Sequence, residues 1–322
     1  MDVSSRNVLQ QPLAHDNTRT GEDRMFRLIR CHGLVFALAL LGATADAATE
    51  IHSLTGVIEG HQVGGVAIDL IGNIYVADFA DDLWKITPEG NRQLFATGFY
   101  GSSGNVVDHE GRVLQSNYYG DTITRIDRNG NAKPFVSAGA GLIGPVGLAM
   151  DRNTNNVYAA NCRGNSIVKI SADGNVAPFA ASSLFHCPNS LAFGSDGNLY
   201  VVNFSDNKML KIDSSGSVAP FAAVSSGGLG HVCFKEDRFY VAAYHTHEIY
   251  EVTLHGGVKR ILGNGERGMV DGGPDKARLS YPNGIACNPW YPRLYVNESI
   301  GESESSLPRR TIVREIDLEP HK

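Results

Sequence analysis

Hydrophobic residues between positions 50 and 319 follow one pattern that recurs about every forty residues. In each copy a small residue opens an apolar segment, a turn follows, and a second apolar segment ends in a pair such as Ala-Asp or Ala-Asn. A third segment ends in Lys-Ile or Arg-Ile, and a fourth follows a turn that closes on glycine. Short segments rich in Tyr, Val and Ile between such turns are typical of β-strands. Each copy therefore predicts four strands.

The copies can be counted at the small residue near the start of each first strand. The equivalent residues are Gly65, Gly104, Gly147, Ser190, His231 and Gly284. Their spacings of 39, 43, 43, 41 and 53 residues define six copies. Proline recurs in three of the fourth strands, as Pro134, Pro178 and Pro220. Because proline has no N–H to donate, these strands are expected at the outer edge of each sheet.

The sixth copy stops after its third strand, at residues 311–316, so its fourth strand is missing. Residues 50–58 resemble the other fourth strands, and the start of the chain is expected to complete the last copy. Four-stranded units of this length predict an all-β fold, a six-bladed β-propeller with four-stranded blades and a ring closed by the N-terminal strand. The alternative is a solenoid, which would not need a strand returned from the other end of the chain.

Residues 1–47 have the features of a leader. Polar residues 1–24 precede Met25, which opens a short basic segment, an apolar run of signal-peptide length and a small-residue cleavage site ending at Ala47. We expect translation to start at Met25, cleavage after Ala47, and a single propeller domain over 48–322. No other apolar segment is long enough to span a membrane. The mature protein is expected to be secreted or periplasmic.

The composition excludes several classes of function. The 322 residues carry a formal net charge of −6 with 28 basic residues, and these are scattered rather than gathered on one face, so no nucleic-acid partner is expected. The chain has no Gly-Lys-Ser/Thr phosphate loop, no Gly-x-Ser-x-Gly nucleophile elbow and no His-Glu-x-x-His motif. No nucleotide or flavin cofactor is expected. The expected partner is a small polar molecule or a peptide, and nothing in the sequence indicates an oligomeric state.

Four cysteines remain after the predicted cleavage. Cys162 follows a second strand and Cys187 precedes the first strand of the next copy, which places both at one face of a propeller. In an exported protein this favours a disulfide between them over a Cys187 thiolate nucleophile. Cys233 and Cys287 lie inside first strands and are expected to be buried free thiols.

The segment that joins the fifth and sixth copies resembles the NHL repeat family. The residues that carry the resemblance are Gly263-x-Gly265-x-x-Gly268, Asp271-Gly272, Ala277-x-Leu279 and Pro282-x-Gly284-Ile-Ala286. More widely, the repeats are similar to the gluconolactonase, regucalcin, paraoxonase and strictosidine-synthase-like propellers. The resemblance implies that ligands bind at one end of the central channel, often with a calcium ion.

In a propeller, the loops that leave the second strands and those that enter the first strands share a face, here called the top. Asp or Asn recurs on it at residues 78, 117, 161 and 203, and a short polar side chain repeated in this way is expected to stabilise its own loop. Side chains that break the repeat are better ligand-binding candidates. They are Tyr100, Ser103, Tyr118, His186, Asn189 and Asn283.

Two metal sites are conceivable on the top face. The resemblance to gluconolactonases implies calcium where the first strands begin, and Asn189 and Asn283 match that pattern, although none of the six equivalent positions carries a carboxylate. Zinc is the second candidate. His245 and His247 alternate along the chain and point the same way if it is extended, and His231 would supply a third imidazole. His231 is also the candidate catalytic base.

Two functions stay open. One is an exported propeller that binds a small polar ligand in its top central pocket and acts on it as a metal-assisted hydrolase of an ester or lactone. The other is a non-catalytic module that binds a protein, peptide or glycan. An acidic side chain near Asn189 and Asn283 would favour the enzyme, whereas an aromatic face around Tyr100 and Tyr118 would favour the binding module.

Overall fold

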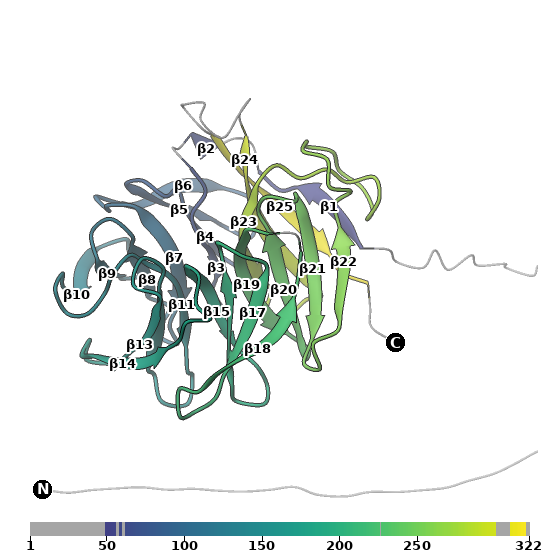
Figure 1. Ribbon diagram of the computed structural model, residues 1–322. Coiled ribbons are helices and arrows are strands. Elements are labelled where there is room, and N and C mark those ends of the chain that lie inside the picture. The colour runs from purple at the N-terminus through teal and green to yellow at the C-terminus, as the bar shows by residue number, and fades with distance from the viewer. Residues whose placement is uncertain (1–48, 56–57, 60–61, 226, 301–309, 320–322) are drawn as a thin grey trace, which may run out of the picture. The chain divides into compact units, whose positions relative to one another are not determined.

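A computed structural model describes residues 49–55, 58–59, 62–225, 227–300 and 310–319 (Figure 1). The predicted start, signal peptide and cleavage site lie outside these residues and stay predictions. Within the described residues the regular structure consists of β-strands. No helix in this part of the chain is both long and apolar enough to cross a membrane.

The strands form six antiparallel sheets, which confirms the six-bladed propeller predicted from the repeats. The first three blades are β3 (Val66–Ile68), β4 (Ile74–Ala77), β5 (Asp82–Ile86), β6 (Arg92–Thr97); β7 (Ser102–Val107), β8 (Val113–Asn117), β9 (Thr122–Ile126), β10 (Ala132–Val136); and β11 (Pro145–Met150), β12 (Val157–Asn161), β13 (Ser166–Ile170), β14 (Val176–Ala181). The fourth and fifth are β15 (Pro188–Phe193), β16 (Leu199–Asn203), β17 (Lys208–Ile212), β18 (Val218–Ala223); and β19 (Leu229–Lys235), β20 (Arg238–Ala243), β21 (Glu248–Thr253), β22 (Val258–Leu262). The prolines of the fourth strands lie in β10, β14 and β18, at the sheet edges as predicted.

The sixth blade joins the two ends of the described chain. Its strands are β23 (Pro282–Cys287), β24 (Arg293–Ile300) and β25 (Arg310–Asp317), and β1 (Glu50–Ser53) lies beside β25 (Figure 1). β1 pairs antiparallel with β25, with Ile51 opposite Ile316, and the short β2 (Ile58–Glu59) pairs with the other end of β25. The N-terminal strand therefore closes the ring as predicted.

The recurring glycine has a steric cause. A Cβ on Gly65 would lie 2.8 Å from the Cα of Gly104 in the next blade, and a Cβ on Gly284 would lie 2.7 Å from the backbone nitrogen of Val66. Real side chains do not approach so closely, so glycine lets neighbouring inner strands meet along the channel. Apolar side chains fill the space between the blades, among them the buried tyrosines Tyr75, Tyr200 and Tyr240 of the second strands.

Two disulfides cross-link neighbouring blades. The predicted Cys162–Cys187 bond is present. The prediction of free thiols at Cys233 and Cys287 is wrong, because these residues form a second disulfide with their Cα atoms 5.7 Å apart. The cysteines lie in β19 and β23, inner strands of adjacent blades, and the curvature of the ring brings them together across 54 residues of sequence.

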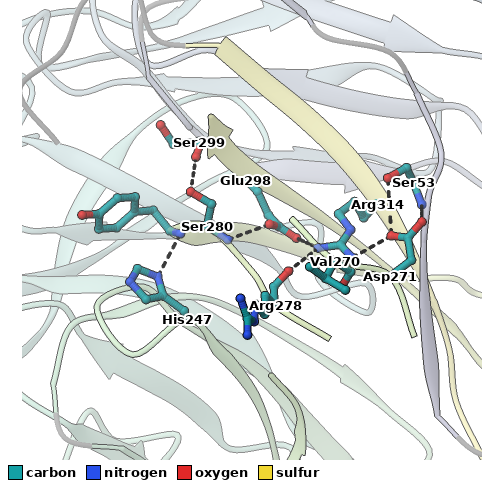
Figure 2. Close-up of polar contacts among 10 residues, drawn as sticks. Ser53, His247, Val270, Asp271, Arg278, Ser280, Glu298, Ser299 and Arg314 are labelled. Atoms are coloured by element: carbon teal, nitrogen blue, oxygen red, sulfur yellow. Dashed lines mark hydrogen bonds and ion pairs between the residues drawn. The ribbon is translucent and has the colours of Figure 1, made fainter. Parts of the chain in front are cut away.

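The last blade is tied together by a buried ion-pair network around Arg314 (Figure 2). The Arg314 side chain is fully buried, and its Nη1 donates to Oε1 of the equally buried Glu298 at 3.0 Å. Its Nη2 donates to Oδ1 of Asp271 at 2.7 Å and to the carbonyl of Val270 at 2.9 Å. Asp271 in turn accepts a hydrogen bond from the backbone nitrogen of Ser53 in β1. One guanidinium thus connects β25, β24, the loop between β22 and β23, and the closing strand.

Burial sets the charge state of this network. Desolvation raises the pKa of Glu298 to about 7, against the opposing effects of Arg314 and of the hydrogen bond donated by the backbone N–H of Ser280. Two buried charges are stable only when they are paired and hydrogen-bonded, so each depends on the other.

Replacing Arg314 with methionine is expected to lower the free energy of unfolding by about 3–5 kcal/mol, because Glu298 is left buried without its cation. To remain in the core, Glu298 would have to take up a proton. That proton is harder to obtain at high pH, so the loss is expected to be larger at about pH 8 than at about pH 5. Urea denaturation at both pH values measures it.

Arg152→Met is the control for this substitution. Arg152 is an exposed arginine of a turn, and its replacement is expected to change stability by less than about 0.5 kcal/mol. If Arg314→Met has the same free energy of unfolding as this control at both pH values, the network does not stabilise the closure of the ring by β1.

Candidate functional site

A cavity of about 170 Å³ opens at the top face of the channel. We call it the top cavity. It is lined by Gln62, Phe79, Ser103, Tyr118, Val146, Cys162, Cys187, Asn189, Phe204, Tyr244 and Asn283. The structure therefore brings together four of the predicted ligand-binding residues, Ser103, Tyr118, Asn189 and Asn283, which come from three blades.

Five lining residues occupy one position of the repeat, at the end of the second strand. They are Phe79, Tyr118, Cys162, Phe204 and Tyr244. Four directly follow that strand, and Phe79 is separated from β4 by Asp78. The backbone N–H groups of the last four donate to the carbonyls of Gly101, Gly144, Cys187 and Gly228, which lead into the inner strands of the same blades. The same backbone bond thus turns each of these residues toward the channel. Except for Tyr118 and Cys162, the sequence analysis missed them, although aligning the six copies at this position would have shown the aromatic residues.

The aromatic residues stand in two pairs. The ring centroids of Phe79 and Tyr118 are 5.6 Å apart, as are those of Phe204 and Tyr244. Burial raises the pKa of Tyr118 above its ordinary value of 10.0, so its phenol is neutral at physiological pH. The backbone of Phe79 has φ 56° and that of Cys187 has φ 53°. Such left-handed conformations are costly for residues with a Cβ and concentrate at functional sites.

Amide groups of the inner strands form the polar part of the cavity. Nδ2 of Asn189 donates to the carbonyls of Leu229 and Gly230, at 3.2 and 2.9 Å. Nδ2 of Asn283 donates in the same way to Val63 and Gly64, at 2.7 and 3.1 Å. The donors of both amides are therefore used by the next blade, and no described residue donates a hydrogen bond to either Oδ1. Together with the Ser103 hydroxyl, they offer hydrogen bonds to a polar ligand.

Two other predicted residues lie on the top face but do not line this cavity. Tyr100 is 65% exposed and packs on Tyr119, with ring centroids 5.4 Å apart. Nδ1 of His186 lies 2.7 Å from Oδ2 of Asp206. Their predicted part in ligand binding stays a prediction that concerns the surroundings of the cavity.

The recurring Asp and Asn residues stabilise loops, which confirms the structural interpretation. Oδ1 of Asp78 accepts a hydrogen bond from the backbone nitrogen of Ala80 at 2.8 Å. Oδ1 of Asn161 accepts one from Ile143 at 3.1 Å, and Nδ2 of Asn203 donates to the carbonyl of Leu184 at 2.9 Å. These bonds fix the loops that carry the cavity residues.

The three histidines of the proposed zinc site have different surroundings. His245 packs against the rings of Phe204 and Tyr244, at centroid distances of 5.5 and 5.1 Å. Nδ1 of His247 accepts a hydrogen bond from the backbone nitrogen of Tyr281 at 3.1 Å (Figure 2). In the part of the chain that the structure describes, no three His, Cys, Asp or Glu side chains form a group that could hold a metal ion.

The donor set of the top cavity does not fit calcium. Calcium takes six to eight oxygen ligands and normally includes carboxylates. Among the described residues, the lining offers amide and hydroxyl oxygens but no Asp or Glu. The nearby carboxylates of Asp78 and Glu298 are engaged by Ser102 and Arg314. Calcium therefore stays a prediction that rests on the family resemblance.

His231 is buried rather than placed in the cavity. It stands where four other copies have glycine, is 6% exposed, and its Nε2 has no hydrogen-bond partner among the described residues. Burial lowers the pKa of His231 to about 4, so the imidazole is neutral at physiological pH. It is not among the residues that line the top cavity. Its predicted role as a catalytic base stays a prediction.

Comparison with known proteins finds similarity in structure rather than in sequence. No protein-family model matches this chain, and no curated protein is significantly similar to it in sequence. Gluconolactonase of Xanthomonas campestris is 16% identical, with a TM-score of 0.64 over 83% of this chain and 89% of its own. A catalytically inactive virginiamycin B lyase of Staphylococcus aureus, solved with quinupristin, is 15% identical, with a TM-score of 0.60 over 84% and 99%.

A third similar structure is an auxiliary nutrient binding protein of Bacteroides thetaiotaomicron. It is 12% identical, with a TM-score of 0.68 over 84% of this chain and 77% of its own. The shared property is the propeller fold. At such identities the likeness carries no activity from one protein to another.

Replacing His231 with serine, the residue of the preceding copy, is expected to change how stability depends on pH. The imidazole has a pKa near 6.5 when unfolded and about 4 when folded, so the unfolded chain binds more protons between these values. Acidification from about pH 7.5 to about pH 4.5 should therefore lower the free energy of unfolding of the wild type by about 2.5 kcal/mol more than that of the variant. Urea denaturation across this range measures the difference. A difference that does not vary with pH would mean that His231 is accessible to water.

Proposed function

We propose that this chain is an exported binding module that holds one neutral, ring-shaped polar group, such as a sugar residue of a glycan, in the top cavity. One observation carries the proposal. Among the described residues, the lining combines four aromatic rings with amide and hydroxyl groups and includes no Asp, Glu, His, Lys or Arg. A site of this composition offers neither a general base nor a charge partner, and it suits a neutral ligand.

The chemistry of the cavity matches such a ligand. Aromatic faces pack against the apolar faces of a ring, and the oxygens of Asn189 and Asn283 accept hydrogen bonds from hydroxyl groups. The volume of about 170 Å³ is below the range of cavities that enclose drug-sized molecules. It therefore suits a single ring, either free or at the end of a longer chain.

Export is part of the proposal. The two disulfides would persist in an oxidising compartment and are rare in a reducing one. They agree with the predicted signal peptide, and we propose a secreted or periplasmic location. The similarity to a propeller described as a nutrient binding protein supports a binding role.

A second candidate function is the hydrolysis of an ester or lactone. It is favoured by Asn189 and Asn283, which lie where the inner strands begin, and by the structural likeness to a gluconolactonase. Because the described residues around the cavity do not fit a calcium site, we derive no catalytic step for it. Release of acid from a panel of lactones by the purified chain would favour this candidate over the binding module.

Substitution of the aromatic lining tests the proposal. A panel of neutral methyl glycosides is titrated into the purified chain by calorimetry, and the best ligand is then titrated into Tyr118→Ala and Phe204→Ala. Each variant is expected to lose about fivefold or more in affinity, since a well-placed aromatic contact contributes about 1 kcal/mol or more.

Tyr291→Ala is the matched control, because Tyr291 is an exposed aromatic residue of the turn between β23 and β24, on the opposite face. It is expected to bind like the wild type, and thermal melting checks that all three variants are folded. Equal affinity of the folded cavity variants and the wild type would place the ligand elsewhere. Absence of binding by every glycoside would reject the sugar as the ligand.

A further inference from the structure

A second cavity, of about 240 Å³, lies on the bottom face, where the turns of the first three blades meet that of the sixth. We call it the lower cavity. We propose that it binds a soluble organic anion that has a carboxylate or phosphate head and a flat apolar body. The top cavity shares no lining residue with it, so this site is independent of the proposed function.

Cationic side chains without ion-pair partners carry the first half of the proposal. Lys85, Arg128 and Arg152 line the lower cavity, and none of them forms an ion pair with any residue that the structure describes. Lys85 lies 5.8 Å from the ring centroid of Tyr75. In a protein with a formal net charge of −6, three such cations around one cavity create a local site for an anion.

The two carboxylates of the cavity offset these cations only in part. Asp108 is already paired with Arg112, and Asp69 keeps its charge although neutral donors satisfy its oxygens, so three cations face one unpaired carboxylate. Asp69 accepts hydrogen bonds from the backbone of Ile71 and Asn73 through Oδ1, and from the side chains of Asn73 and Tyr75 through Oδ2. Asp108 accepts three bonds, among them one from Nε of Arg112 at 2.7 Å. Both are buried, at 8% and 7% exposure.

Arg128 is held in place for this role. Its Nε donates to the carbonyl of Glu110 at 2.7 Å. A Cβ on Gly111, which has φ +73°, would lie 2.8 Å from that nitrogen, so the glycine provides the space in which the arginine lies. With Nε committed to the protein, the terminal amino groups are left to meet a carboxylate or phosphate.

An exposed apolar rim carries the second half of the proposal. Ile71, which lines the cavity, is 78% exposed, and Leu70 beside it is 48% exposed. Trp290 is 66% exposed, and its Nε1 donates to the carbonyl of Leu70 at 2.8 Å, which fixes the indole next to this turn. A flat apolar body would cover these side chains while its anionic head meets the arginines.

Four probes separate the two halves of the site. Phenyl phosphate carries both head and body, inorganic phosphate only the head, benzyl alcohol only the body, and phosphatidylglycerol vesicles present the head on a lipid surface. We expect phenyl phosphate to bind the full chain more tightly than inorganic phosphate or benzyl alcohol does. We also expect its affinity to fall as salt is added. Calorimetric titration measures the soluble probes, and co-sedimentation measures the vesicles.

Substitutions assign the binding to the lower cavity. Arg128→Gln and Arg152→Gln are each expected to weaken phenyl phosphate binding about tenfold or more, as loss of a charge-assisted hydrogen bond does. Trp290→Ser should weaken phenyl phosphate without affecting inorganic phosphate. Lys133→Gln, which removes an exposed cation of β10 outside the cavity, is the control and should leave both affinities unchanged.

Each of the following results would overturn one part of the proposal. Equal binding by Arg128→Gln and wild type would reject the arginine site, and melting curves show that the variant is folded. Equal affinity for phenyl phosphate and inorganic phosphate would reject the apolar body. Binding to vesicles without binding of phenyl phosphate would reject a soluble ligand. None of these outcomes depends on whether the top cavity binds a sugar.

Discussion

Closure of the ring by β1 on β25 is the constraint on which the rest of the structure depends. A propeller has no central core, and its channel keeps its shape only if the last blade is complete. The backbone pairing of Ile51 with Ile316 supplies the missing strand. The buried guanidinium of Arg314 then joins that strand to β24 and to the loop before β23 (Figure 2). The top cavity lies at one end of the channel that this closure preserves, and the lower cavity lies on the opposite face of the ring.

The same repeat builds the scaffold and the candidate site. One position of the inner strands holds a small residue in five of the six copies because neighbouring inner strands meet there. Another position, just after the second strand, can turn its side chain toward the channel. In five blades that side chain lines the top cavity. In the sixth it is Ser299, which is buried, and the preceding residue Glu298 turns into the core and pairs with Arg314. The site is therefore open to variation where the scaffold is not, which is how one fold serves many functions.

The fold was predictable from the sequence because strand periodicity, turn residues and the missing fourth strand are all local patterns. Asn189 and Asn283 were predictable as cavity residues since they follow from the position of a residue within its copy. Contacts between different copies were not predictable from the sequence. The Cys233–Cys287 bond depends on the spacing of two inner strands around the ring. The burial of His231, which is 6% exposed, likewise belongs to the assembled ring and cannot be inferred from one copy.

The central claim is that the top cavity recognises a neutral ligand through aromatic and amide groups, without a metal. The most direct test is the elemental metal content of the purified chain, combined with its affinity for the best neutral sugar before and after chelation. We predict no stoichiometric calcium or zinc and an unchanged affinity after chelation. Stoichiometric metal whose removal abolishes binding would contradict the claim and favour the metal-assisted hydrolase instead.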